Sequence, residues 1–261
     1  MSGDAATLEK ADGVAVITLN RPHARNAVNG DLSAAVGQAL EELDADRDVQ
    51  VGIVTGTGPA FCAGADLKAL AAGESITAPA HPDWGFAGLV EHVISKPLIA
   101  AVNGFALGGG TEIMLACDLA VVSEAASLGF PEVKRGLFAA AGGLIRMPRQ
   151  IPVKVTMELA LTGRIMSPQE ALGWGLVNRV VPANEVMTAA MELARAVAAN
   201  APLAVRSSKR LVHRATAAGS DWDGDVWALQ REELDRILAS DDAQEGTRAF
   251  AEKRPPSWTG S

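Results

Sequence analysis

The sequence predicts an α/β protein with a helical C-terminal region. Two observations support this: short β-branched apolar runs alternate with segments of helical periodicity in the first half of the chain, and the pattern becomes mainly helical after Pro131. Strands separated by helices require crossover connections, which are typical of α/β proteins. The length of 261 residues suits one large domain, or one domain with a small appendage.

The first elements follow from local patterns. Residues 14–19 form a β-branched apolar run that Asn-Arg-Pro closes, which predicts a buried strand and a turn. Residues 29–44 carry apolar side chains at helical spacing, which predicts an amphipathic helix. Residues 73–85 have no clear period and are predicted to form a loop. Further strands are predicted at 51–55, 98–102 and 119–122, and helices at 66–72, 86–94 and 111–117.

The second half of the chain is predicted to be mostly helical. A change in composition near residue 200 divides the chain into a core, residues 1–200, and a C-terminal helical region, residues 201–261. An extended segment is expected at 176–181, and helices at 153–161, 168–172, 185–199, 202–217, 227–240 and 241–253.

Composition excludes several classes of protein. Hydrophobic residues make up 48% of the chain and charged residues 21%, which is ordinary for a globular protein and argues against disorder. The chain has 23 basic and 31 acidic residues, a net charge of −8, so we expect no nucleic-acid partner. No apolar run approaches the roughly 20 residues of a membrane span, and we expect no membrane partner.

The cysteines and histidines point to a reducing setting without a metal. Cys62 and Cys117 are the only cysteines, and the N-terminal residues do not have the pattern of a signal peptide, so we expect a cytoplasmic protein. None of the four histidines shows the spacing of metal ligands, so no metal is expected.

Two glycine-containing turns each follow a predicted strand and precede a predicted helix, at residues 61–66 and 103–112. Neither is a nucleotide-binding fingerprint, and either one alone is more often a simple chain reversal. The triple glycine at 108–110 is nevertheless specific in one respect. It lets the backbone approach a ligand closely and leaves the first helical amides unpaired, which suits an oxygen that gains negative charge.

Glu112 and Glu132 are candidate catalytic acids. Each one alone is explained by an acidic residue in the first turn of a helix, where the helix dipole stabilises it by roughly 0.3–1 kcal/mol. Glu132 follows Pro131, a residue common at the first helical position. Their combination with the two glycine turns favours catalysis.

With these motifs in order, the chain resembles the enoyl-CoA hydratase/isomerase (crotonase) family from about residue 8 to 258. The matching segments are LNRP at 19–22 with NA at 26–27, AGAD at 63–66, KP at 96–97, NG at 103–104, GGGTE at 108–112, CDLA at 117–120, FPE at 130–132, LTGR at 161–164, and residues 171–181 and 245–254. The resemblance implies a spiral of ββα units with a C-terminal helical region that supports a homo-oligomer, a trimer or a dimer of trimers.

The resemblance also implies a mechanism. The backbone amides of Ala65 and Gly109 match the positions that bind the thioester oxygen of an acyl-CoA substrate. Glu112 and Glu132 match the two glutamates of hydratases, which hold one water between them. By this match Glu112 activates the water and Glu132 donates the proton to Cα. No cofactor is expected, because coenzyme A is part of the substrate.

Two further sets of residues complete the predicted site. Backbone and side chains that match the CoA-binding segments of the family are Arg25, Asn26, Ala27, Ala63, Asp66, Leu67, Phe250 and Lys253. Residues that we expect to line the acyl pocket, although each is equally explained as core, are Trp84, Phe86, Leu89 and Phe138.

The segment after the second glutamate departs from the family pattern. Many hydratases have Pro, Gly and Thr where this chain has Ala139, Ala140 and Leu144. This departure motivates an alternative reaction. Because both glutamates are present, the leading prediction is still an enoyl-CoA hydratase, a hydro-lyase that converts a 2,3-unsaturated acyl-CoA to 3-hydroxyacyl-CoA. A carnitinyl-CoA-type dehydratase or an enoyl-CoA isomerase is the alternative within the fold. A non-catalytic acyl-CoA binder or an RNA binder is the alternative from another class.

Overall fold

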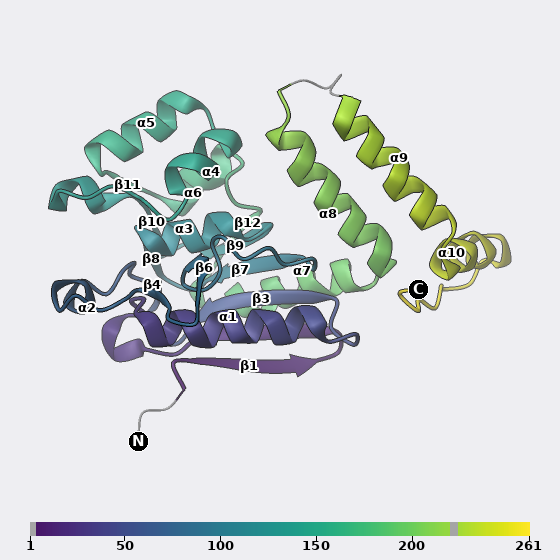
Figure 1. Ribbon diagram of the computed structural model, residues 1–261, viewed down its shortest axis with the longest axis horizontal. Helices are drawn as coiled ribbons and strands as arrows, with labels where there is room; N and C mark the ends of the chain where they lie inside the picture. Colours follow the sequence, from purple (N-terminus) through teal and green to yellow (C-terminus); the bar gives the residue numbers. More distant parts are fainter. Residues whose placement is uncertain (1–3, 220–223) are drawn as a thin grey trace.

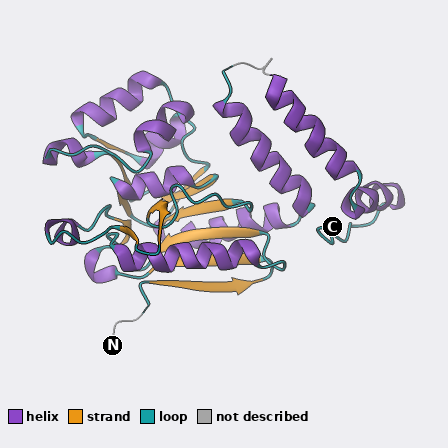
Figure 2. Ribbon diagram, viewed as in Figure 1, coloured by secondary structure: helices purple, strands orange, loops and turns teal. Residues whose placement is uncertain are grey.

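The structure is a computed structural model that describes residues 4–219 and 224–261. A layered α/β body occupies most of the chain, and the C-terminal helices project from one side of it (Figures 1 and 2). Within the described ranges, no helix has both the length and the apolar character that crossing a membrane requires.

The body contains two main sheets. The larger has the order β1-β2-β3-β7-β9-β12, with the antiparallel pair β1–β2 at its edge and parallel pairs beyond. Its strands are β1 (Ala6–Ala11), β2 (Val14–Leu19), β3 (Val51–Gly56), β7 (Leu98–Val102), β9 (Leu119–Ser123) and β12 (Arg179–Val181). The smaller has the order β11-β10-β8-β4, with strands β4 (Ala60–Cys62), β8 (Phe105–Leu107), β10 (Ser127–Gly129) and β11 (Ile165–Met166).

Each strand of the smaller sheet's parallel set follows directly from a strand of the larger sheet. β3 leads to β4, β7 to β8 and β9 to β10, and a helical segment follows each short strand: α2 (Leu67–Ala71), α3 (Gly109–Ala116) and the 3-10 helix η2 (Pro131–Arg135). These repeated ββα units confirm the predicted α/β spiral.

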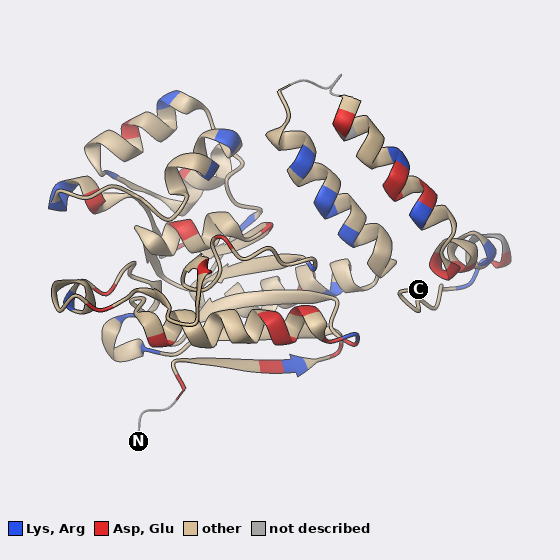
Figure 3. Cartoon of the chain, viewed as in Figure 1, with Lys and Arg blue, Asp and Glu red and all other residues tan. Residues whose placement is uncertain are grey.

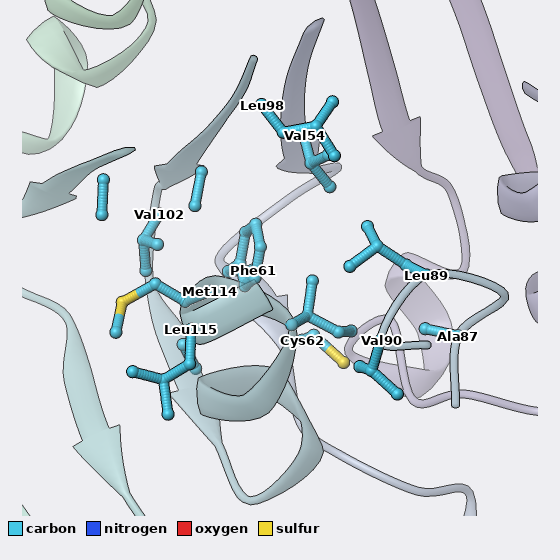
Figure 4. Close-up of a cluster of buried hydrophobic side chains, with 14 of the residues drawn as sticks. Val54, Phe61, Cys62, Ala87, Leu89, Val90, Leu98, Val102, Met114 and Leu115 are labelled. Carbon is cyan, nitrogen blue, oxygen red and sulfur yellow. The ribbon is translucent and has the colours of Figure 1, made fainter. Parts of the chain in front are cut away.

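The two faces of the larger sheet are buried against different helices. Because strand side chains alternate between faces, Ile53 and Ile99 pack on α7 (Val186–Ala198) while Val54 and Ala100 face the main core. α1 (Gly30–Ala45) covers the main core near β1 and β2. Figure 4 shows Phe61 and Cys62 of β4 at the centre of this core, beside Met114 and Leu115 of α3.

Further helices complete the body and the C-terminal region. They are α4 (Gly143–Gln150), α5 (Val153–Thr162), α6 (Pro168–Gly173), α8 (Pro202–Ala217), α9 (Gly224–Leu238) and α10 (Asp241–Glu252), with 3-10 helices at Pro22–Ala24 and Ala183–Glu185. The predicted division near residue 200 falls in the connection between α7 and α8.

α8 carries a row of basic residues, and two of its side chains attach it to the body (Figure 3). Lys209 Nζ lies 2.8 Å from Asp118 Oδ2, and His213 Nε2 lies 2.8 Å from Asp118 Oδ1. Asp118 is itself held by the Leu98 amide, at 2.8 Å. One half-buried carboxylate, just after the end of α3, therefore joins α8 to the start of β7.

Most predicted elements are present, but the helix expected at 86–94 is wrong. Gly85, Ala87 and Gly88 have φ values of 71°, 59° and 64°, and this left-handed backbone breaks a helix. A methyl group on Gly88 would lie 2.1 Å from the Ser33 carbonyl oxygen, so this turn presses against α1. The loop expected at 73–85 is also wrong, because it contains the hairpin of β5 (Thr77–Ala78) and β6 (His81–Phe86).

Replacing Gly37 with alanine is expected to destabilise the fold. A methyl group there would lie 2.1 Å from Trp84 Cε3, so overpacking should lower the free energy of unfolding by about 1–3 kcal/mol despite the better helix propensity of alanine. Urea denaturation measures this change. Gly173→Ala is the control, because no atom lies within 4 Å of its added methyl group. Equal stability of the two variants would contradict the packing argument.

Candidate active site

The candidate site lies where three parallel strands end. β4, β8 and β10 are in register through Cys62, Ala106 and Leu128, so the turns that follow them meet at one edge of the smaller sheet. These turns carry every residue of the predicted oxyanion hole and acid–base pair. Residues far apart in the sequence thus converge through strand pairing alone.

The turns after β4 and β8 are in direct contact. A methyl group on Gly64 would lie 3.3 Å from the Gly109 nitrogen and 3.1 Å from the Leu107 carbonyl oxygen. The Gly108 amide donates to the Gly129 carbonyl at 2.9 Å, which fixes the second turn to β10. The backbone around Ala65 and Gly109 is therefore held as one unit.

Both predicted oxyanion amides are available. The bridge between Val28 and Ala65 uses the Gly64 carbonyl and the Asp66 amide, and leaves the Ala65 N–H out. Gly109 is the first residue of α3, where backbone N–H groups have no helical partner. Within the described residues, neither amide donates to a protein acceptor. Two unpaired donors beside each other suit an oxygen that becomes negative.

Glu112 is buried in the first turn of α3, with 3% of its surface exposed. Its Oε1 accepts a hydrogen bond from the Gly143 amide at 2.8 Å. Burial raises the pKa of Glu112 to about 7, the Gly143 and Ala141 amides lower it, and the neighbouring charge of Glu132 raises it. The carboxyl therefore exchanges a proton near neutral pH.

Glu132 lies in η2, and its carboxyl lies against the turn after β8. A methyl group on Gly108 would lie 2.7 Å from its Oε1, and the φ of 57° at Gly108 favours glycine there. Its Oε2 is buried and has no hydrogen-bond partner among the described residues. Burial also raises the pKa of Glu132. Two carboxyls with raised pKa values beside free amides form a site able to move protons to and from a substrate.

Two predicted CoA-binding residues near the N-terminus, Asn26 and Asp66, bind other groups of the protein with their side chains. Asn26 is fully buried, and its Nδ2 donates to the carbonyls of Thr57, Ala60 and Phe61. Asp66 caps α2 and pairs with Arg21 Nη2 at 3.0 Å. Arg25, Ala27, Ala63 and Leu67 lie in the same loop system, where the Ala63 amide donates to the Arg25 carbonyl.

The two C-terminal CoA-binding residues lie elsewhere. Lys253 follows α10 in the projecting helical region, with a left-handed φ of 56° (Figure 1). The side chain of Phe250 lies outside the described residues. Lys253 therefore belongs to the C-terminal helical region, whereas the glutamates lie in α3 and η2 of the body.

The four predicted acyl-pocket residues separate into different environments. The Phe86 ring lies at the oxyanion turn, since a methyl group on Gly109 would be 2.4 Å from its Cζ. Trp84 is stacked between His81 and His92, with ring centroids 3.9 and 4.6 Å away. Leu89 is buried in the main core, and Phe138 is 64% exposed on the connection between η2 and α4.

Sequence reasoning missed the role of the segment that begins α4. Gly143 binds Glu112, and a methyl group on it would lie 3.0 Å from Glu112 Cγ and 2.6 Å from the Phe130 ring. The positive charge of Arg146, one helical turn later, also lowers the pKa of Glu112. The signal in the sequence was the Gly142-Gly143 pair, which opens a helix after the second glutamate.

A model of the enoyl-CoA hydratase/isomerase family matches residues 9–261. The chain belongs to this family. A carnitinyl-CoA dehydratase of Proteus mirabilis is 44% identical over 250 residues, 94% of each protein. Among solved structures, an enoyl-CoA hydratase from Mycobacterium tuberculosis has a TM-score of 0.93 at 43% identity and covers 99% of this chain and 100% of its own. A carnitinyl-CoA hydratase from Mycobacterium avium has a TM-score of 0.79 at 50% identity, with full coverage of both chains.

Family membership makes the chain a crotonase-family enzyme with hydratase or dehydratase chemistry. The comparisons therefore support both the leading prediction and its carnitinyl-CoA alternative at this level.

The raised pKa of Glu112 predicts how stability depends on pH. The folded protein holds this proton more tightly than the unfolded chain, so the free energy of unfolding should fall as pH rises from about 4.5 to about 7, by up to about 3 kcal/mol. Glu112→Gln removes this loss of stability with rising pH. The free energy of unfolding of the variant relative to wild type should therefore be higher at pH 8 than at pH 5. Urea denaturation at both values tests this. Equal pH dependence in wild type and variant would contradict the assignment; exposed Glu124→Gln is the control.

Proposed function

We propose that this protein is a hydro-lyase that adds water to Cβ of a 2,3-unsaturated acyl-CoA and catalyses the reverse dehydration. The observation that carries the proposal is the pair of carboxyls, buried Glu112 and half-buried Glu132, beside the Ala65 and Gly109 amides, which have no acceptor among the described residues. An isomerase needs proton transfer only, whereas two acid–base groups can divide the proton transfers of water addition.

In the hydration direction, Glu112 takes a proton from water as the water oxygen bonds to Cβ. The electrons of the double bond move to the thioester oxygen, where the Ala65 and Gly109 amides stabilise the enolate by roughly 2.7–4 kcal/mol per donor. The enolate then collapses, and Cα takes its proton from Glu132. Apart from the water that is added, every group in this scheme belongs to the protein or to the thioester, with coenzyme A as part of the substrate.

We also propose which acyl group the substrate carries. The curated carnitinyl-CoA dehydratase at 44% identity and the M. avium carnitinyl-CoA hydratase at 50% support carnitinyl-CoA and its dehydrated form over a simple enoyl-CoA. Ala139, Ala140 and Leu144 replace the usual hydratase residues beside the site, which agrees with an altered acyl group. We propose that Phe86 lines the acyl pocket, because its ring lies at the Gly109 turn.

We further propose that the enzyme works in the cytoplasm as a homo-oligomer. Cys62 and Cys117 are both free thiols, which agrees with a reducing compartment. One face of α5 exposes Val153, Met157 and Leu161 at helical spacing, with 58%, 51% and 71% of their surfaces accessible. An apolar stripe of this kind is typical of a surface that a second subunit covers. Assembly would also place Lys253 near the nucleotide part of a CoA that is bound to a neighbouring subunit.

Loss of either glutamate is expected to abolish most activity. Glu112→Gln and Glu132→Gln should each lower kcat for hydration by about 10²–10⁴, because each removes one acid–base step. The assay follows 3-hydroxyacyl-CoA formation from crotonyl-CoA and from dehydrated carnitinyl-CoA, with exposed Glu124→Gln as the control. Wild-type turnover to an isomerised alkene without hydroxyacyl product would overturn the proposal. Retained turnover in both variants would overturn the site.

Met157→Asp is expected to weaken the oligomer. A charge in the middle of a buried apolar stripe costs several kcal/mol, so light scattering should show a lower molar mass at equal protein concentration. Lys154→Asp places the same residue on α5 outside the stripe and should keep the wild-type mass. A wild-type protein that is monomeric at all concentrations would contradict the proposed assembly.

A further inference from the structure

Thr111 lies between Gly109 and Glu112 in the first turn of α3, and the scheme above gives it no role. It is fully buried, with 0% of its surface exposed. A buried hydroxyl lowers the stability of a fold unless it finds hydrogen-bond partners. Within a helix, a threonine hydroxyl usually bonds to a carbonyl three or four residues earlier. The partners of Thr111 lie instead in two strands.

The Thr111 hydroxyl connects β8 and β10, the strands that lead into the site. Its Oγ1 accepts a hydrogen bond at 2.9 Å from the amide of Gly129, the last residue of β10. It donates to the Ala106 carbonyl of β8 at 2.5 Å. The Gly129 carbonyl oxygen lies 3.2 Å from Oγ1, but a hydroxyl has one hydrogen, and the nearer Ala106 oxygen accepts it. One side chain of α3 therefore binds backbone groups of both strands.

Gly129 is held on both of its polar groups. Its amide donates to Thr111, and its carbonyl accepts a hydrogen bond from the Gly108 amide at 2.9 Å. A methyl group on Gly129 would lie 2.9 Å from the Arg164 carbonyl oxygen, so the chain just before β11 packs against its other side. The end of β10 is thus fixed to the start of α3 by two hydrogen bonds, and one of them is made by the Thr111 side chain.

The position of Glu132 follows from the end of β10. Glu132 comes three residues after Gly129, and Pro131 opens η2 with a φ that its ring fixes. The Glu132 carboxyl lies against the turn after β8, because a methyl group on Gly108 would be 2.7 Å from its Oε1. The distance between this carboxyl and the turn therefore depends on how β10 is joined to α3, which is the contact that Thr111 makes.

We propose that Thr111 is a positioning residue that fixes the Glu132 carboxyl relative to the amides of Ala65 and Gly109. This inference rests on the proposed function, because their relative position matters only if the carboxyl and the amides act on one thioester. The Thr111 hydroxyl already has two backbone partners, so it acts through Gly129 and does not bind the substrate. A displacement of about 1 Å between reacting groups can lower a rate by about 10².

A purely structural role is the competing explanation, since loss of the Thr111 hydroxyl removes a partner from two buried backbone groups and lowers stability. Thr111→Val removes the hydroxyl and keeps the shape of the side chain, whereas Thr111→Ser keeps the hydroxyl. Thr55→Val is the matched control for stability. It also removes a buried hydroxyl, one that donates to the Ala101 carbonyl at 2.9 Å within the larger sheet.

The first measurement is kcat and KM for the hydration of crotonyl-CoA and of dehydrated carnitinyl-CoA. Thr111→Val should lower kcat by about 10–100-fold and change KM by less than about twofold, because the groups that act in the transition state are displaced while CoA binding is kept. Thr111→Ser should keep kcat within about threefold of wild type. Thr55→Val should lose thermal stability and keep the wild-type kcat.

Two outcomes of this measurement would overturn the inference. Equal kcat values for Thr111→Val and Thr55→Val would mean that the hydroxyl only stabilises the fold. An equal loss of kcat in Thr111→Ser and Thr111→Val would mean that packing of the methyl group matters and the hydrogen bonds do not.

The second measurement needs no water addition. In D₂O, ionised Glu132 can take a proton from Cα of butyryl-CoA, the amides hold the enolate, and a deuteron returns to Cα. This exchange should be about 10–100-fold slower in Thr111→Val and near the wild-type rate in Thr111→Ser. Equal rates in wild type and Thr111→Val would overturn the inference.

The exchange also separates the inference from the proposed function. If wild type exchanges Cα protons but hydrates no enoyl-CoA, the proposed function fails, while slower exchange in Thr111→Val still supports the positioning role. If wild type does neither, both fail. Thermal unfolding verifies that each variant folds. Thr111→Cys replaces Thr111→Val if that variant does not, because a thiol is only a weak donor and acceptor, and its kcat should lie about tenfold below that of Thr111→Ser.

Discussion

The close approach of backbone to backbone at the ends of β4, β8 and β10 is the constraint on which this site depends. A methyl group on Gly110 would lie 2.0 Å from the Cys62 carbonyl oxygen, and one on Gly64 would crowd the Gly109 nitrogen. Glycine is required here because no side chain fits between the turns. The result is a pair of amides without an acceptor in the described part of the chain, held in place by three parallel strands.

Burial raises the pKa values of both carboxyls, and it lowers the stability of the fold. Taking Glu112 out of water disfavours its charged form and raises its pKa to about 7, where a proton can be gained and lost during a reaction cycle. Glu132 retains a buried oxygen that has no hydrogen-bond partner in the part of the chain that the structure describes. An unpaired polar atom of this kind destabilises a fold by about 1–3 kcal/mol, and its retention here is typical of a functional site.

The two glutamates have different surroundings. Glu112 has the Gly143 amide and Arg146 near it, and both favour its ionised form. No corresponding cation acts on Glu132 among the described residues. Burial outweighs both contributions and raises the pKa of Glu112 to about 7, so the two carboxyls exchange protons as a coupled pair.

The sequence by itself determined the elements with long, regular patterns, such as the strand at 14–19 and the helix at 202–217, and it picked out both glutamates and both amide-bearing turns. Local pattern and ordered motifs carry that information. The tertiary structure alone decided the rest. The 86–94 segment became a turn because Gly88 meets α1, Trp84 was stacked between two histidines, and Gly143 and Arg146 were brought to Glu112. These outcomes depend on which segments pack together, and spacing along the chain does not encode distances between elements far apart in sequence.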